Sequence, residues 1–266
     1  MFPNIQIGSR IISSYMIFSL AGILLCLYYC YHQAEEYKLD EFHALYMILF
    51  SSIGVVFGAH LLYGFTNFSQ LVHLMGNILK FNEFNEFLQE ATAVFGGSVF
   101  YGGLFGGLCV GLIYIRYNHL NLGDYSDLVA PAIPLFHFWG RLGCFTSGCC
   151  YGIPWEDGVL YRFSLAPFAN GVCRFPVQLV EAVFNLILFA VLHILFRKKR
   201  AIHLLLPIYL SVYPVYRFVL EYFRGDMYRG FIGIFSTSQF ISIILLCVDC
   251  IFWISHFRHK KYMAAL

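Results

Sequence analysis

Long apolar runs separated by short polar segments make up most of the chain. Each run is close to the roughly 20 residues that a helix needs to cross the hydrocarbon core of a membrane. They predict seven transmembrane helices, at residues 11–31, 44–65, 92–115, 128–146, 177–196, 203–220 and 231–257. We therefore expect an all-α polytopic membrane protein in which residues 1–266 form a single transmembrane domain.

The fourth run is the least apolar of these, because it contains Pro131, Pro134, His137 and Arg141. Proline lacks a backbone donor and disturbs the helix that contains it. Irregular backbone is tolerated at membrane depth only where protein or water covers it. This run therefore predicts a broken helix that does not face lipid.

Basic residues in two loops predict the orientation. Residues 197–200 and 258–261 are rich in Lys and Arg, which is typical of cytoplasmic loops. Both loops are cytoplasmic if the N-terminus lies outside and the C-terminus lies in the cytoplasm. The first run lacks the charged start and the small-residue cleavage site of a signal peptide, so we expect it to be retained.

In this topology three polar segments face the outside, at residues 66–90, 148–176 and 221–230. The segment 66–90 mixes aromatic side chains with amides and charges, which makes it too polar to cross the membrane and too apolar to leave its surface. It predicts an interfacial arm on the outer leaflet. Residues 148–176 predict an outer loop region.

Composition excludes a soluble globular domain. Hydrophobic residues make up 59% of the chain, charged residues make up 12%, and the mean hydropathy is +0.69. One core cannot bury that much apolar surface. The net charge of +2 and the lack of a basic stripe interleaved with aromatic residues give no reason to expect a nucleic-acid partner.

The segment 136–152 interrupts the apolar pattern with an arginine, three cysteines and four glycines. An ionised side chain costs roughly 3 kcal/mol or more at the centre of a bilayer and is normally functional. We therefore interpret Arg141 and its neighbours as the active-site segment.

Polar side chains recur on one face of each of two predicted helices. On the fifth helix they are Gln178, Glu181 and Asn185. On the sixth helix they are Tyr213, Arg217, Glu221 and Arg224. A buried carboxylate needs a cation, which for Glu181 is Arg141 or Arg217. Both faces are open to two interpretations, an ion-pair ladder that fixes packing or a chemical site.

Two or three arginines that converge near the outer membrane surface are what a phosphate site requires. Guanidinium groups match phosphate oxygens in pairs and stay charged when partly desolvated. The sequence contains no nucleotide-binding loop. We therefore expect the ligand to be an anionic lipid headgroup.

The chain has nine cysteines. Five of them are interpreted as small apolar residues inside predicted spans, namely Cys26, Cys30, Cys109, Cys247 and Cys250. The others, Cys144, Cys149, Cys150 and Cys173, cluster on the outer side as thiols or disulfides. Their spacing is not a usual zinc pattern and no histidine follows closely, so we expect no metal. A thiolate beside Arg141 would be a candidate nucleophile.

Glycines crowd the third run, and Gly103, Gly107 and Gly111 share one helix face. Glycine at this spacing lets another helix approach closely. Helix packing and a role in the site are both open for these glycines. Tyr101, which lies beside them, is a functional candidate.

Several stretches together resemble one family, the bacterial prolipoprotein diacylglyceryl transferases. The resemblance covers nearly the whole chain, at Tyr15, Gly58–Leu61, Tyr101–Leu104, Gly140–Phe145, Phe175–Glu181, Tyr213–Asp226, Gly233, Gln239 and Ser242. Members of the family are seven-span enzymes with the N-terminus outside. They move the diacylglyceryl group of phosphatidylglycerol onto the lipobox cysteine of a secreted lipoprotein precursor and release glycerol phosphate.

The family signature, Gly-Arg-x-Gly-Asn-Phe-x-Asn-x-Glu, is matched only in part. Cys144 stands at the first asparagine, Ser147 at the second and Cys149 at the glutamate. Tyr101 stands where the family has a histidine. The arginines that the family uses for phosphate are kept, so the resemblance is strongest at the anion site.

The resemblance implies a transferase of the bacterial cytoplasmic membrane that acts on phosphatidylglycerol and a lipoprotein precursor and needs no cofactor. It implies catalytic roles for Tyr101, Arg141, Glu181, Arg217, Glu221 and Cys149. It implies substrate-binding roles for Tyr15, Gly102, Gly103, Gly140, Gly143, Gln178, Tyr213 and Arg224. The general base for the incoming thiol stays open between Glu181, Glu221 and Tyr101.

Two alternative functions follow from the positions at which the sequence departs from the family signature. In one, Cys149 or Cys150 carries the lipid transiently before passing it to another acceptor. In the other, the chain is a non-catalytic protein that binds anionic lipid.

Overall fold

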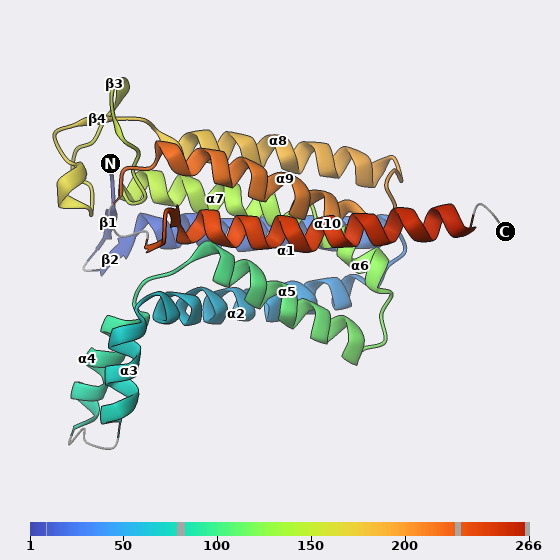
Figure 1. Cartoon of the computed structure of the whole chain (residues 1–266), viewed down its shortest axis with the longest axis horizontal. Helices are drawn as coiled ribbons and strands as arrows, with labels where there is room; N and C mark the ends of the chain where they lie inside the picture. Colours follow the sequence, from blue (N-terminus) through green and yellow to red (C-terminus); the bar gives the residue numbers. More distant parts are fainter. Residues whose placement is uncertain (9, 79–82, 227–229, 264–266) are drawn as a thin grey trace. The chain divides into compact units, whose positions relative to one another are not determined.

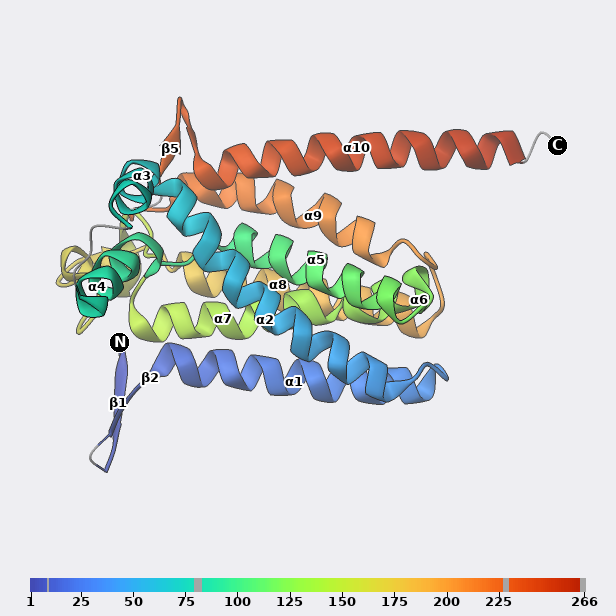
Figure 2. The same cartoon turned by 90° about the horizontal axis from the view of Figure 1, so that it is seen from below.

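The structure is a computed structural model that describes residues 1–8, 10–78, 83–226 and 230–263 (Figures 1 and 2). The chain divides into two compact units. The first contains Met1–Gln33 and Gly123–Leu266, and the second contains Ala34–Leu122. Most residues of both units are helical, which confirms the predicted all-α class.

The first unit is built mainly from helices, most of them long. They are α1 (Ser14–Glu36), α6 (Leu122–Val129), α7 (Ala132–Ser147), α8 (Val177–Arg197), α9 (Leu205–Leu220) and α10 (Thr237–Met263), with short 3-10 turns at η1 (Pro167–Ala169) and η2 (Glu221–Phe223). Helix α8 packs against both α7 and α9, and α9 packs against α10. The polar faces predicted on α8 and α9 therefore belong to neighbouring helices.

Short antiparallel hairpins flank these helices. The pairs are β1 (Asn4–Ile7) with β2 (Arg10–Ser13), β3 (Pro154–Leu160) with β4 (Cys173–Arg174), and β5 (Phe231–Ile232) with β6 (Phe235–Ser236). The second hairpin lies in the predicted outer loop region, and an isolated bridge joins Gly152 in this region to Arg224 beyond α9.

The second unit contains two long and two short helices. They are α2 (Glu41–Thr66), α3 (Phe68–Asn77), α4 (Phe84–Phe95) and α5 (Phe100–Tyr117). Asp40 caps α2 by accepting a hydrogen bond from the backbone N–H of His43 at 2.8 Å, as an N-cap residue does. Helices α3 and α4 occupy the segment predicted as an interfacial arm, and its position on the membrane stays a prediction.

Six helical segments of the described chain are long and apolar enough to cross a membrane. They are α1, α2, α5, α6 with α7, α8 and α10. The remaining predicted span corresponds to α9, which has 16 residues. About 20 residues are normally needed to cross the hydrocarbon core, so the polytopic architecture is confirmed while the number of seven crossings stays a prediction.

Three predicted span boundaries are wrong. Residues 11–13 belong to β2, residues 92–95 belong to α4, and residues 231–236 belong to the hairpin before α10. Short apolar strands and helix ends cannot be told apart by hydropathy. The break before α5 falls at Gly96 and Gly97, where glycine weakens a helix.

The broken fourth span is confirmed. The chain leaves α6 at Val129 and starts α7 at Ala132, with Pro131 between them. Half of the most apolar window of this span is buried, a larger share than in the other five candidate spans. Burial by protein accounts for its high content of polar residues.

Glycines let α2 and α5 pack closely. A Cβ added to Gly102 would lie 2.3 Å from the carbonyl oxygen of Gly58, and one added to Gly106 would lie 2.2 Å from that of Gly54. A Cβ added to Gly103 would lie 3.2 Å from the side chain of Val55. The packing interpretation of the glycine-rich helix is therefore correct, and a substrate-binding role for Gly102 and Gly103 stays a prediction.

The helices of the first unit have two distinct ends. At one end the backbone N–H of Phe2 donates to Thr146 at 2.8 Å, and that of Ile153 donates to Phe223 at 3.0 Å. At the other end Asp127 of α6 accepts a hydrogen bond from the N–H of Leu205 at 3.0 Å. The N-terminal hairpin and the outer loop region therefore share the first end, which lies on the left of Figure 1.

Candidate active site

Glu181 is the centre of a buried polar cluster between α7, α8 and α9. Its side chain is fully buried. The Nε of Arg141 lies 3.0 Å from Glu181 Oε2, and the Nε2 of His137 lies 3.3 Å from Oε1. The hydroxyl of Tyr213 donates to the same Oε1 at 3.1 Å. One carboxylate thus links two neighbouring helices to α8.

Helical spacing explains how these groups meet. His137 and Arg141 are four residues apart on α7, so they lie on one face, and the Nε of Arg141 donates to the Nε2 of His137 at 3.2 Å. Pro176 immediately precedes α8, which suits the start of a helix. This start places Glu181 in the second turn of α8, close to the end of the unit that holds the outer loop region.

A second ion pair lies on α9. The Nη2 of Arg217 is 2.7 Å from Glu221 Oε2 and donates to Ser238 at 3.2 Å. Arg217 Nη1 is buried and has no hydrogen-bond partner among the described residues. The charges of Arg141 and Arg217 both act on Glu181. The two arginines therefore both lie near Glu181, as predicted. The Nη1 group of Arg217 is the donor that this arrangement leaves unused.

The third arginine, Arg224, closes the same end of the unit. It is buried, and its Nε donates to Asp226 at 2.8 Å. The backbone bridge between Gly152 and Arg224 holds it against the outer loop region. Each of the three arginines therefore has a carboxylate neighbour.

Gln178 ties α8 to the outer loop region. It accepts a hydrogen bond from Tyr161 at 2.8 Å and donates to the carbonyl of Cys149 at 2.6 Å. Burial raises the pKa of Tyr161 to about 12, so this phenol stays a donor at neutral pH. Gln178 therefore acts on the shape of the loop, and a direct contact with substrate stays a prediction.

Three cysteines gather at the end of α7. The Sγ atoms of Cys144, Cys149 and Cys150 all lie within 4.8 Å of one another. The pKa of Cys150 is well below its usual value, first because Cys144 and Cys149 hydrogen-bond to its sulfur and then because arginines lie nearby. Hydrogen bonds with Cys144 and Cys150 raise the pKa of Cys149. The cluster thus favours one thiolate, at Cys150.

Comparisons with known proteins agree on one family. The family model described as prolipoprotein diacylglyceryl transferase matches residues 4–255. The chain belongs to the prolipoprotein diacylglyceryl transferase family.

Individual relatives carry the same description. The phosphatidylglycerol–prolipoprotein diacylglyceryl transferase of Streptococcus uberis is 30% identical over 264 residues, which cover 96% of this chain and 95% of that protein. The enzyme of the same name from Clostridium tetani is 29% identical over 90% of this chain and 91% of its own length. A second such enzyme of Clostridium perfringens is 35% identical over 65% of this chain and 70% of its own length. The chain is thus a transferase of this family and a multi-pass membrane protein.

The predicted diacylglyceryl transferase residues are divided between the two units. Arg141, Glu181, Tyr213 and Arg217 meet in the buried cluster described above, with Glu221 beside Arg217. Cys149, Gln178 and Arg224 lie at the adjoining end of the first unit, while Tyr101, Gly102 and Gly103 belong to α5 of the second unit. The catalytic and binding roles of all these residues stay predictions.

The remaining predicted residues lie along α1 and α7. A Cβ added to Gly143 would lie 3.1 Å from the ring of Tyr15, so this glycine lets α1 approach α7. A Cβ added to Gly140 would meet nothing within 4 Å. Of the two glycines, only Gly140 has open space next to it, and a substrate-binding role for Gly140 stays a prediction.

Sequence reasoning missed His137 as a member of the site. Its side chain is buried and contacts both Arg141 and Glu181. The sequence did contain a sign of this role. His137 lies four residues before Arg141, and this spacing puts both side chains on one face of α7.

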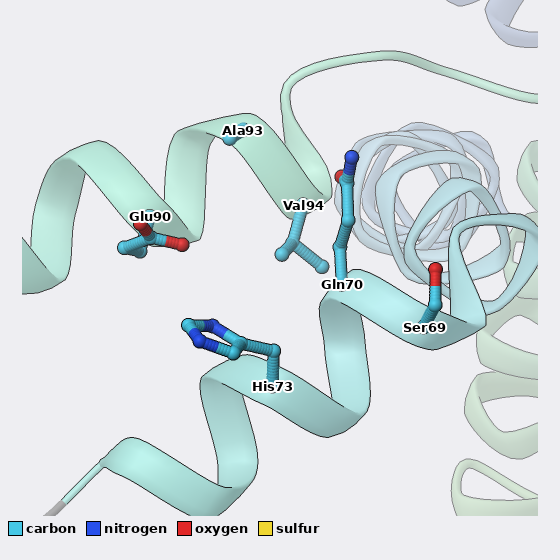
Figure 3. A pocket seen from close by; sticks show the side chains of 6 residues that line it. All are labelled: Ser69, Gln70, His73, Glu90, Ala93 and Val94. Carbon is cyan, nitrogen blue, oxygen red and sulfur yellow. The ribbon is translucent and has the colours of Figure 1, made fainter.

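A hollow of about 290 Å³ lies between α3 and α4 of the second unit (Figure 3). It is lined by Ser69, Gln70, His73, Glu90, Ala93 and Val94. None of the predicted transferase site residues lines it. The predicted site residues that the structure brings together lie in the buried cluster of the first unit instead.

Proposed function

We propose that the chain transfers the diacylglyceryl group of phosphatidylglycerol to a cysteine thiol of a secreted lipoprotein precursor, at the outer face of a bacterial cytoplasmic membrane. The names of the relatives supply the two substrates. The observation that carries the proposal is the pair of buried arginines, Arg141 and Arg217, around Glu181.

The reaction is a displacement at a glycerol carbon. The sulfur of the acceptor thiolate forms a C–S bond, the C–O bond to phosphate breaks, and its electron pair leaves with the phosphate oxygen. Negative charge therefore grows on the leaving phosphate. Fixed cations in a dry site stabilise such charge strongly, because they need no reorganisation.

Ion pairs with carboxylates fix the positions of the arginines before the substrate binds. Glu221 fixes the Nη2 of Arg217, which leaves Nη1 buried and without a partner among the described residues. Leaving a buried charged donor unsatisfied is costly. A phosphate oxygen that reaches Nη1 removes this cost, so ligand binding is favoured at that position.

The carboxylates also limit the net charge of the site. Three arginines face Glu181, Glu221 and Asp226. Recognition then depends on the direction of the N–H donors more than on an excess of positive charge. This arrangement favours one phosphate diester over anions in general, since guanidinium groups bind phosphate through paired hydrogen bonds.

Transfer by a cysteine of the chain is the second candidate function. The structure offers it limited support, because the pKa of Cys149 is raised and the thiolate character falls on Cys150. If a lipid is carried on the enzyme, mass spectrometry of protein quenched during turnover will find it on Cys150.

The test of the proposed function uses the full chain in vesicles that contain phosphatidylglycerol, together with a lipobox peptide. Mass spectrometry should detect the diacylglyceryl thioether of the peptide and released glycerol phosphate. Arg217→Gln should lower kcat/KM about 10²–10³-fold, the usual effect of removing one donor from a developing anion. Arg217→Lys should fall between, because lysine keeps the charge but not the fork.

Arg162→Gln is the matched control, since Arg162 is an exposed arginine of the outer loop region. Its activity should equal that of the parent chain. Absence of thioether product from a preparation that binds phosphatidylglycerol would overturn the proposal and favour a non-catalytic lipid-binding protein.

A further inference from the structure

The three-cysteine cluster is formed by a reversal of the chain at the end of α7. Gly148 has a φ of +75° and ends the helix, a conformation that glycine adopts without strain. Cys150 also has a positive φ of 55°. The reversal brings Cys149 and Cys150 back to Cys144, so that three thiols separated along the sequence by up to six positions share one small volume.

The spacing of the sulfurs is close to that of a thiolate metal site. Zinc–sulfur bonds are about 2.3 Å long, and tetrahedral geometry then puts the sulfurs about 3.8 Å apart. The three Sγ atoms of the cluster lie within 4.8 Å of one another. Shifts of about 1 Å or less in cysteine side chains therefore suffice to surround one ion.

The surroundings of the cluster suit an anionic metal complex. Three thiolates and one divalent ion leave a single negative charge. The buried guanidinium groups of Arg141 and Arg224 both act on Cys150. A buried charge is tolerated when a fixed opposite charge is close, and these arginines provide it.

We propose that Cys144, Cys149 and Cys150 bind one thiophilic divalent metal ion, with Zn²⁺ as the natural example, and that the acceptor cysteine of the substrate takes the fourth position. Three protein ligands with one open position are typical of catalytic zinc sites. The assignment of the fourth position rests on the proposed function, whereas the three-cysteine site itself does not.

The metal supplies the activation that the acceptor thiol needs. On coordination the thiol loses its proton to water, because a metal-bound thiol is deprotonated. The resulting thiolate attacks the glycerol carbon, and the electron pair of the broken C–O bond leaves with the phosphate. The thioether product carries no charge and is a weaker ligand than a thiolate, so it departs from the metal. No separate general base is required.

The first experiment measures metal binding without any turnover. The purified full-length protein is reduced, stripped with a chelator and titrated with Co²⁺. One equivalent per chain should produce thiolate-to-cobalt charge-transfer absorption, and Zn²⁺ should abolish it. Cys149→Ser and Cys150→Ser should each lose most of this absorption. Cys173→Ser is the control, because Cys173 lies in the same loop region but outside the cluster, and it should keep the full signal.

Absence of the charge-transfer absorption in the parent chain with nine free thiols would overturn the metal site. Equal loss in Cys173→Ser would also overturn it. The thermal midpoint of each metal-free variant is measured in parallel. A variant that loses the signal while it keeps the parent midpoint has lost a ligand rather than its fold, and only such variants count as support.

The second experiment tests the open position in the Co²⁺-loaded Arg217→Gln chain, in which transfer is slow. A lipobox peptide should increase the charge-transfer absorption by adding a thiolate, and the same peptide with serine in place of cysteine should not. An unchanged spectrum would overturn thiol activation by the metal. A changed spectrum together with absence of thioether product from the parent chain would overturn the proposed function and keep the metal site.

Discussion

Glu181 is the residue on which the buried cluster depends, because Arg141 and His137 of α7 and Tyr213 of α9 all contact its carboxylate. Breaking a buried ion pair leaves the remaining charge without compensation, which costs about 3–5 kcal/mol. We expect Glu181→Gln to lower the stability of the protein by about this amount and to abolish transfer.

Thermal unfolding in detergent measures this effect. Glu156→Gln is the control, since Glu156 is an exposed glutamate of β3, and its midpoint should equal that of the parent chain. A midpoint for Glu181→Gln that matches the control would show that the carboxylate is not needed to hold the three helices together.

Cys150 gives a prediction on pH in the reduced, metal-free protein. Its pKa is lowered by hydrogen bonds from Cys144 and Cys149 and by nearby Arg224 and Arg141. A thiolate is present above the pKa and is lost below it. Alkylation of Cys150 by iodoacetamide should therefore stay fast as pH falls through the range in which a model peptide thiol becomes unreactive.

The variant Arg224→Gln tests the electrostatic part of this effect. Its alkylation profile at Cys150, followed by peptide mass spectrometry, should move to higher pH because one positive charge is removed. A profile for the parent chain that coincides with the model peptide would contradict the lowered pKa.

At the scale of single residues, the sequence predicted the charged groups better than the thiols. Arg141, Glu181 and Arg217 were expected to converge, because only paired charges are stable at that depth. Which three of the four outer cysteines approach one another was not predicted. The close approach of the three sulfurs depends on the left-handed turn at Gly148, and hydropathy and spacing carry no information about that turn.

Helices α2 and α5 depend on glycine for their contact. A Cβ added to Gly102 would lie 2.3 Å from a backbone oxygen of α2, and backbone cannot move aside as a side chain can. We expect Gly102→Ala to destabilise the second unit by about 1–3 kcal/mol, the usual cost of overpacking. Denaturant unfolding in detergent, with a fluorescent label on the second unit, measures the loss.

Gly76→Ala is the control for this substitution. Gly76 lies near the end of α3, and a Cβ there would meet nothing within 4 Å. Because alanine favours a helix over glycine, this variant should be as stable as the parent chain or slightly more so. Equal stability of both variants would contradict the close packing of α2 and α5.

At the scale of helices and strands, the sequence predicted where helices exist better than where they end. The predicted glycine face at Gly103, Gly107 and Gly111 is only part of the contact, because the closest approaches to α2 occur at Gly102 and Gly106. Spacing within one helix does not identify its partner helix. The start of α10 was also predicted wrongly. The hairpin before it is as apolar as a membrane helix, so hydropathy does not separate the two.

At the scale of the whole molecule, the orientation of the first unit decides which compartment supplies the acceptor. The buried cluster and the outer loop region share one end of this unit, and the basic residues 197–200 lie at the other end, where α8 stops. Cytoplasmic loops are enriched in basic residues. We therefore expect the cluster end to face the outside, where secreted lipoprotein precursors arrive.

Comparing the two ends of the first unit also bears on whether α9 crosses the membrane. Helix α8 runs from the cluster end to the basic end, and α9 runs back, since Leu205 at its start contacts Asp127 and Arg217 near its end contacts Ser238. Helix α9 therefore runs antiparallel to α8 within the first unit, although it has only 16 residues against the 21 of α8. The 3-10 turn that follows it adds to its length, and protein rather than lipid satisfies its polar face.

Protease-cleavable tags inserted at three turns test this topology in spheroplasts. Gly171 and Gly233 have positive φ and open surroundings, and Lys199 lies in the basic loop. External protease should cut the tags at 171 and 233 in intact spheroplasts and the tag at 199 only after permeabilisation. Protection of the tag at 233 beside cleavage at 171 would mean that α9 does not cross. In that case Arg217 and Glu181 would approach from opposite compartments, which is incompatible with the ion-pair cluster, so this outcome would contradict the proposed site as well as the seventh crossing.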